Sequence, residues 1–131
     1  MHGSVKIPSD MSNLFRAENL IDDLAEKLNF GDVVYGNISV SIIEAVSNAI
    51  QHGNQNDVTK LVLLDYKVID DQLVFTISDE GNGFDLDTVP DPTLPENLEN
   101  IKGRGIFLIR NLADKVSFEE RGAIIIIYFN L

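Results

Sequence analysis

The first third of the chain alternates apolar and polar residues with the period of a helix. Apolar side chains recur at steps of three and four, which places them on one helix face. They are Leu14, Ala17, Ile21, Leu24 and Leu28. Ser9 or Asp10 can cap this helix, and Asn29-Phe30-Gly31 ends it. A second helix is predicted from about Asp32 to His52, with Gly53-Asn54 as its end.

The rest of the chain carries shorter apolar runs that predict β-hairpins. Residues 60–69 and 72–79 form two strands joined by a tight turn at Asp70-Asp71. Residues 115–120 and 123–130 form a closing hairpin. The other predicted segments are a short edge strand, a long loop that holds three of the four prolines, and a third helix. They are Ser4–Pro8, Phe84–Lys102 and Gly105–Ala113.

These elements predict an α+β fold in a single domain, residues 1–131. A chain of this length can bury one hydrophobic core. Because the strands come as hairpins and the helices lie between them, we expect an antiparallel or mixed sheet with the helices on one face.

The charge of the chain disfavours nucleic acid as a partner. Ten Lys and Arg stand against 21 Asp and Glu, a net charge of −11 at pH 7. Such a surface repels a phosphate backbone. A bound nucleotide would meet the same repulsion, so it would need magnesium, local cations or helix N-termini.

The lack of cysteine and of long apolar runs limits the types of site and the cellular location that we expect. The chain has no cysteine, which excludes disulfides and thiolate metal sites. The N-terminus lacks a long apolar stretch, and no run approaches the roughly 18 successive apolar residues of a membrane span. We therefore expect a cytoplasmic protein without a membrane partner.

The first motif whose residues could bind a ligand or catalyse a reaction lies on the second predicted helix. Glu44 and Asn48 are four residues apart and hence neighbours on one face. They belong to a polar stripe of Asn37, Ser41, Glu44, Asn48, Gln51 and His52. Taken alone, such a stripe is typical of a solvated helix face. Its functional interpretation makes Asn48 an oxygen ligand for magnesium and Glu44 a base beside phosphates.

His52 is interpreted as a group at the helix C-terminus rather than a phosphate acceptor, because a positive charge is favourable there.

The second motif is Asp79-Glu80-Gly81-Asn82-Gly83-Phe84, directly after a predicted strand. Two glycines one residue apart allow the backbone to approach a flat ligand closely. A carboxylate at Asp79 could accept a hydrogen bond from an exocyclic amine such as that of adenine. An ordinary turn after a strand is the alternative.

The third motif is a glycine turn that leads into the third helix, Gly103-Arg104-Gly105. Free N–H groups at a helix N-terminus bind anions, and small residues let phosphate oxygens reach them. Lys102 and Arg104 add positive charge to an otherwise acidic chain. By itself, this pattern also fits a simple loop-to-helix junction.

The order of the three motifs resembles the superfamily of gyrase, Hsp90, histidine-kinase and MutL (GHKL) ATPase domains. More narrowly, the chain resembles the anti-sigma-factor serine/threonine protein kinases of bacterial stress and sporulation switches. The family pattern E-x-x-x-N-A-x-x-H matches Glu44, Asn48, Ala49 and His52, D-x-G-x-G-F matches Asp79, Gly81, Gly83 and Phe84, and G-x-G matches Gly103 and Gly105. The resemblance covers almost the whole chain. It implies the Bergerat ATP-binding fold, a two-layer α/β sandwich with a mixed, mostly antiparallel sheet.

The resemblance also implies a role for each matching residue, with ATP and Mg²⁺ as cofactors. Glu44 would be the general base, and Asn48 the protein ligand to Mg²⁺. Asp79 would bind the adenine amine, with Gly81 and Gly83 making room. Lys102, Gly103, Arg104 and Gly105 would hold the phosphates.

By this resemblance, the function is phosphorylation of a serine on a STAS-domain anti-anti-sigma partner, together with sequestration of a sigma factor. A homodimer through the N-terminal strand and first helix is also implied. Two alternatives stay open. One is a non-catalytic, ATP-gated binding module, although Glu44 argues against it because a pure binder needs no base. The other is the catalytic fragment of a histidine kinase acting in trans, although only ten residues precede the first predicted helix.

Overall fold

The computed structural model of the chain describes residues 1–81 and 104–131. Within these residues a five-stranded sheet runs in the order β1-β2-β3-β5-β4, and every neighbouring pair is antiparallel. The strands are β1 (His2–Pro8), β2 (Leu61–Ile69), β3 (Gln72–Ser78), β4 (Lys115–Glu119) and β5 (Ile124–Asn130). The prediction of an α+β fold is confirmed, and no parallel pair occurs in the described part of the sheet.

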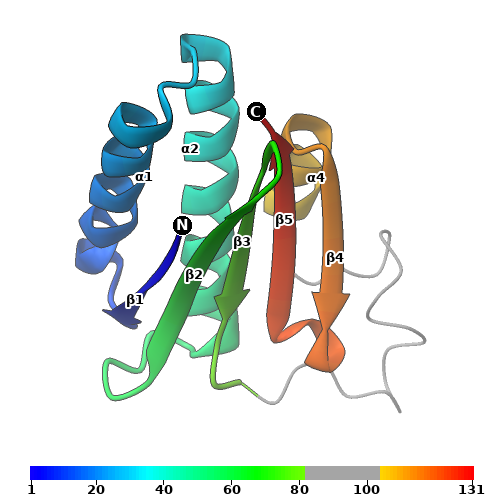
Figure 1. Ribbon diagram of the computed structural model, residues 1–131. Coiled ribbons are helices and arrows are strands. Elements are labelled where there is room, and N and C mark those ends of the chain that lie inside the picture. Colours follow the sequence, from blue (N-terminus) through cyan, green and yellow to red (C-terminus); the bar gives the residue numbers. More distant parts are fainter. Residues whose placement is uncertain (82–103) are drawn as a thin grey trace.

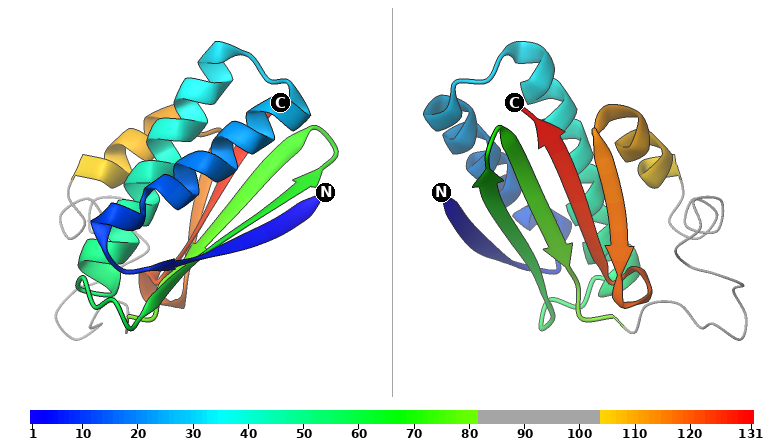
Figure 2. Two further views of the ribbon diagram at one scale, coloured as in Figure 1. Left: turned by 90° about the vertical axis from the view of Figure 1, so that its left-hand side faces the viewer. Right: turned by 45° about the vertical axis from the view of Figure 1, so that its right-hand side comes forward.

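The helices cover one face of this sheet (Figures 1 and 2). They are α1 (Phe15–Leu28), α2 (Asp32–Asn48) and α4 (Arg104–Leu112). Alternate residues of each strand point toward this layer, and the register aligns them: Leu64 of β2 is opposite Ile77 of β3, which is opposite Ile125 of β5. All three belong to the buried core. The sheet is therefore closed by helices on one side and open on the other.

The ends of the elements follow from local chemistry. Asp10 accepts a hydrogen bond from Ser12 N and caps a 3₁₀ turn, Met11–Asn13, which precedes α1. The predicted cap at Asp10 thus starts this short turn, and α1 begins at Phe15. Asn29 takes a left-handed conformation (φ 52°) and ends α1 as predicted. Asp70, also left-handed (φ 55°), closes the tight β2–β3 hairpin.

The second helix is the centre of the helical layer, between α1 and α4 (Figure 2). It continues from α2 into a π-helical turn, η2 (Ala49–Gly53), so its end at Gly53 agrees with the prediction. By length and mean hydropathy (1.3), the span Asp32–Gly53 could cross a membrane, which differs from the expectation drawn from apolar runs. A core helix meets the same criterion, and Ile38, Ile42, Val46 and Ile50 are fully buried in this core.

Candidate functional site

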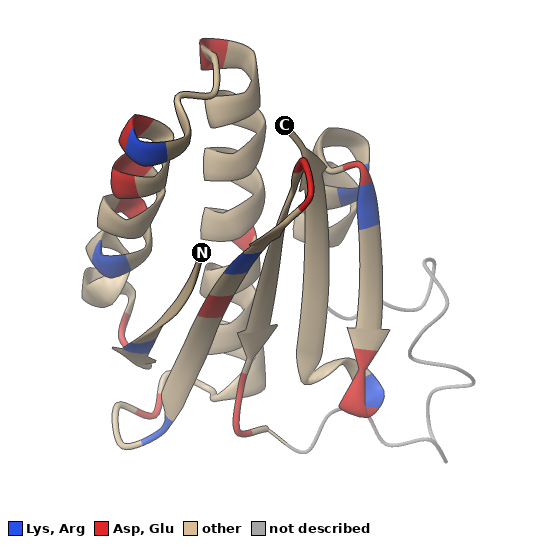
Figure 3. Cartoon of the chain, viewed as in Figure 1, with Lys and Arg blue, Asp and Glu red and all other residues tan. Residues whose placement is uncertain are grey.

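Glu44 and Asn48 lie one turn apart on α2 and face the same direction. Glu44 is the only charged residue of α2 after Asp32, and the ribbon of this helix is otherwise almost free of charge (Figure 3). Its side chain is half-buried, and that of Asn48 is only 7% exposed. A carboxylate placed in an apolar helix at this depth points to a role other than solubility.

The beginning of α4 packs directly over these two side chains. A Cβ atom at Gly105 would lie 2.9 Å from Oε2 of Glu44 and 3.0 Å from Nδ2 of Asn48. Any residue other than glycine would therefore have to displace one of them. The contact brings the first and third sequence motifs together, and it sets a carboxylate and an amide beside the first turn of α4.

The polar stripe of α2 is buried at Ser41 and Asn48 and exposed at Gln51 and His52. Ser41 is fully buried and Asn48 nearly so. Ser41 Oγ and Asn48 Nδ2 have no hydrogen-bond partner among the residues that the structure describes. The alternative interpretation of a solvated helix face is thus wrong for these two positions. His52 is exposed in the last turn of η2, at the helix end where it was expected.

The second motif meets the end of the same helix. Asp79 follows β3, and its carboxylate lies so close to Gly53 that a Cβ there would be 2.2 Å from Asp79 Oδ2. Gly81 N donates to Asp79 Oδ1 at 2.8 Å. A Cβ on Gly81 would in turn lie 2.4 Å from the carbonyl oxygen of Gly53. Gly53, which the sequence marks only as a helix end, is therefore part of the site, and no spacing signal reveals it.

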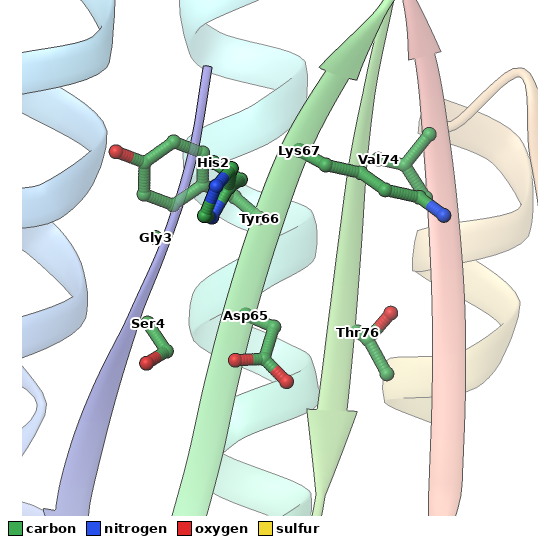
Figure 4. Close-up of a pocket in the computed structure, with 8 residues that line it drawn as sticks. All are labelled: His2, Gly3, Ser4, Asp65, Tyr66, Lys67, Val74 and Thr76. Carbon is green, nitrogen blue, oxygen red and sulfur yellow. The ribbon is translucent and has the colours of Figure 1, made fainter.

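A broad hollow of about 530 Å³ opens beside this turn, lined by Ser78, Asp79, Gly81, Arg121 and Ile124 among others. Arg121 brings a cation to this hollow, and Asp79 and Glu120 bring carboxyl groups. A further hollow of about 360 Å³ lies on the open face of the sheet (Figure 4). Its polar groups include Ser4, Asp65, Lys67 and Thr76, none of which belongs to a sequence motif. No motif residue lines this second hollow.

The donor set agrees with a nucleotide held together with magnesium. The described residues contain no group of three or more His, Asp or Glu side chains that could hold a metal alone. Magnesium prefers few protein oxygens and completes its shell with phosphate oxygens and water. An amide presents an oxygen or a nitrogen depending on its partners, so the buried, unpartnered amide of Asn48 fits such a ligand.

Some predicted site residues lie beyond what the structure describes. Gly83, Lys102 and Gly103 fall within residues 82–103, as does the predicted long loop. Arg104 is described only as the first residue of α4. The roles expected of these four residues remain predictions.

Comparison with known proteins agrees with this geometry. Residues 7–129 match the family model of the histidine kinase-like ATPase domain, and the chain belongs to that family. The predicted GHKL resemblance is confirmed.

Individual relatives carry more specific names than the family model does. The chain is 24% identical over 128 residues to the serine-protein kinase RsbW of Oceanobacillus iheyensis, covering 93% of this chain and 81% of that protein. It is 32% identical over 104 residues to the serine-protein kinase RsbW of Staphylococcus aureus (strain JH9), covering 73% of this chain. It spans 64% of the length of that second relative.

Proposed function

We propose that this protein is an ATP-dependent serine/threonine protein kinase. The observation that carries the proposal is the contact of Glu44 and Asn48 with Gly105 at the start of α4. It supports the proposal because the Glu44 carboxylate, the Asn48 amide and the first turn of α4 lie close together. Phosphoryl transfer requires mainly positioning and charge neutralisation, and this arrangement offers both. The names of the RsbW relatives support the same activity.

Each residue has a distinct part in this proposal. Asp79, held against Gly53, accepts a hydrogen bond from the amine of adenine. The N-terminus of α4 binds phosphate oxygens through its N–H groups. Asn48 would hold a magnesium ion, which would supply positive charge to neutralise the phosphates of bound ATP. Glu44 accepts the proton of the attacking serine hydroxyl.

The partner proposed from the resemblance is a STAS-domain anti-anti-sigma protein, with a sigma factor as a second partner and a homodimer as the assembly. The acidic balance of the chain, −11, suits partners with basic patches. A cytoplasmic location follows from these partners.

The test is transfer of γ-labelled phosphate, with magnesium, to STAS-domain proteins of the same genome. We expect label on a partner serine, and a loss of about 10²–10⁴-fold in rate for Glu44→Gln, which keeps the shape but removes the base. Asn48→Ala should weaken binding of Mg-ATP and lower the rate as well. Glu119→Gln, at an exposed position of β4, is the matched control and should retain the wild-type rate.

Two results would contradict the kinase. Binding of Mg-ATP that depends on Asn48, without transfer to any STAS protein, would favour the ATP-gated binding module. Acid-labile phosphate on a histidine of another protein would favour the histidine-kinase fragment. Phosphate transfer by Glu44→Gln at the wild-type rate would show that Glu44 is not the general base.

A further inference from the structure

The side chain of Asn54 is fully buried directly after the helix end at Gly53. All its hydrogen-bonding groups are used to join three distant segments. Nδ2 donates to Ser9 Oγ at 2.9 Å and to the carbonyl oxygen of Leu61 at 3.1 Å. Oδ1 accepts from the backbone N–H of Glu80 at 2.7 Å. Asn54 therefore ties the end of β1, the start of β2 and the turn after β3 to one point. We call these four residues, Ser9, Asn54, Leu61 and Glu80, the turn network.

The orientation of the Asn54 amide is determined by its partners. Ser9 Oγ donates to the carbonyl oxygen of Lys60 at 2.7 Å, so toward Asn54 it serves as an acceptor. The Leu61 carbonyl is also an acceptor, whereas the Glu80 N–H is a donor. Only one of the two amide orientations satisfies all three partners, because rotation would set the oxygen against two acceptors. The amide thus presents its oxygen to the turn.

The turn network borders the residue proposed to recognise the base. Glu80 is the neighbour of Asp79, and its own carboxylate accepts the backbone N–H of Leu61. Asp79 is pressed against Gly53, the neighbour of Asn54. Two consecutive residues of the helix end thus contact two consecutive residues of the turn. Glycine supplies the room for the Asp79 carboxylate, and Asn54 holds the backbone from which that carboxylate extends.

We propose that Asn54 is a positioning residue for nucleotide-base recognition and acts through the backbone of the turn on Asp79. The inference rests on the proposed function, in which Asp79 binds the adenine amine. A side chain that reads one hydrogen bond must be held within about 0.5 Å of its place to discriminate between bases. If the amide of Asn54 is lost, the turn loses its link to β1 and β2, and the selectivity of Asp79 should fall.

The experiment compares the dissociation constants of ATP and ITP, which carries an oxygen in place of the 6-amino group, by calorimetry well below the unfolding temperature. The wild-type chain should bind ATP more tightly. In Asn54→Ala we expect the ratio of the two constants to fall about tenfold, the effect of one misplaced hydrogen bond. Ser9→Ala, which removes one support of the amide, should lower the ratio by a smaller factor.

A control separates positioning from loss of stability. Leu24→Ala removes a buried side chain of α1 that is no part of the turn network, and it should destabilise the fold by a comparable amount. Partial unfolding lowers the apparent affinity for both nucleotides by the same factor. This variant should therefore keep the wild-type ratio of the two dissociation constants. A wild-type ratio in Asn54→Ala would overturn the positioning role and leave the kinase proposal intact. Equal binding of ATP and ITP by the wild-type chain would instead overturn the role of Asp79, and this inference with it.

Discussion

The second half of α2 and the turn network just beyond the helix end differ in how their buried polar atoms are satisfied. In the second half of α2, Ser41 Oγ and Asn48 Nδ2 are buried without a hydrogen-bond partner among the described residues. In the turn network, Ser9 and Asn54 are fully buried and every polar atom of the Asn54 amide is paired. A buried polar group without a partner costs free energy, so proteins rarely leave one unless a ligand supplies the bond.

The difference indicates a division of labour. The turn network is complete in the protein alone, so the place where the base is read exists before the nucleotide arrives. In the second half of α2 the hydrogen bonding is incomplete among the residues that the structure describes, which is the state expected of a site whose partners include a phosphate. Base recognition is therefore preorganised in the turn network, whereas the second half of α2 gains its missing hydrogen bonds only when the ligand binds.

The strongest test of this difference is to truncate one asparagine in each region, Asn54 in the turn network and Asn48 in α2. Asn54→Ala should lower the free energy of unfolding by about 2–4 kcal/mol, because it leaves several buried groups without partners. Asn48→Ala should cost about 1 kcal/mol or less, because it breaks no hydrogen bond in the described residues and replaces a poor helix former with a good one. Urea unfolding without nucleotide measures both. Equal losses would show that the two amides are equally well satisfied.

A second test uses two glycines of the same helix. Gly53→Ala places a Cβ 2.2 Å from Asp79 Oδ2 and forces the carboxylate away, so we expect a loss of about 1–3 kcal/mol in stability. Gly36→Ala, with no atom within 4 Å of the new Cβ, should stabilise α2 by about 0.5–1 kcal/mol. Thermal unfolding of the two variants should shift in opposite directions. A stabilising Gly53→Ala would mean that the turn is not packed on the helix end.

The smallest effect concerns the exposed residue next to the turn network. Hydrogen bonds from the side chain and then the backbone N–H of Ser12 lower the pKa of Asp10 below its ordinary value. The ionised form is therefore favoured in the folded protein. Its stabilising contribution is present above the pKa of the unfolded chain and is lost as the pH falls through the lower folded value.

Carboxyl-carbon NMR titration tests this assignment. Ser12→Ala should raise the pKa of Asp10 toward its ordinary value, and Ser12→Thr should preserve the lowered one. The nucleotide site should not respond to either change. An unaltered titration in Ser12→Ala would show that the hydrogen bonds from Ser12 do not lower the pKa of Asp10.

Periodicity accounts for much of what the sequence could predict. The helix steps from Leu14 to Leu28, the hairpin at Asp70-Asp71 and the closing hairpin are local patterns, and the structure confirms them. The neighbouring positions of Glu44 and Asn48 also follow from helix geometry alone.

The parts that could not be predicted depend on contacts between distant segments. Nothing in the spacing of Ser41 shows that it is buried, since burial depends on how distant segments pack around it. Asn54 reads as a residue of a helix end, and its partners Ser9 and Glu80 are 45 and 26 residues away. Gly53 likewise gains its significance only when the turn after β3 folds against it.

These long separations have a consequence for the order in which the protein assembles. The pairing of β1 with β2 joins Pro8 to Leu61, and the turn network closes over chain lengths of 45 and 26 residues. Closure of such loops costs entropy before the contacts repay it, so nonlocal elements form slowly. The ribosome must also deliver β2 and β3 before Asn54 can meet its partners. Helical signal should therefore return early in refolding, and the capacity to select a base should return last.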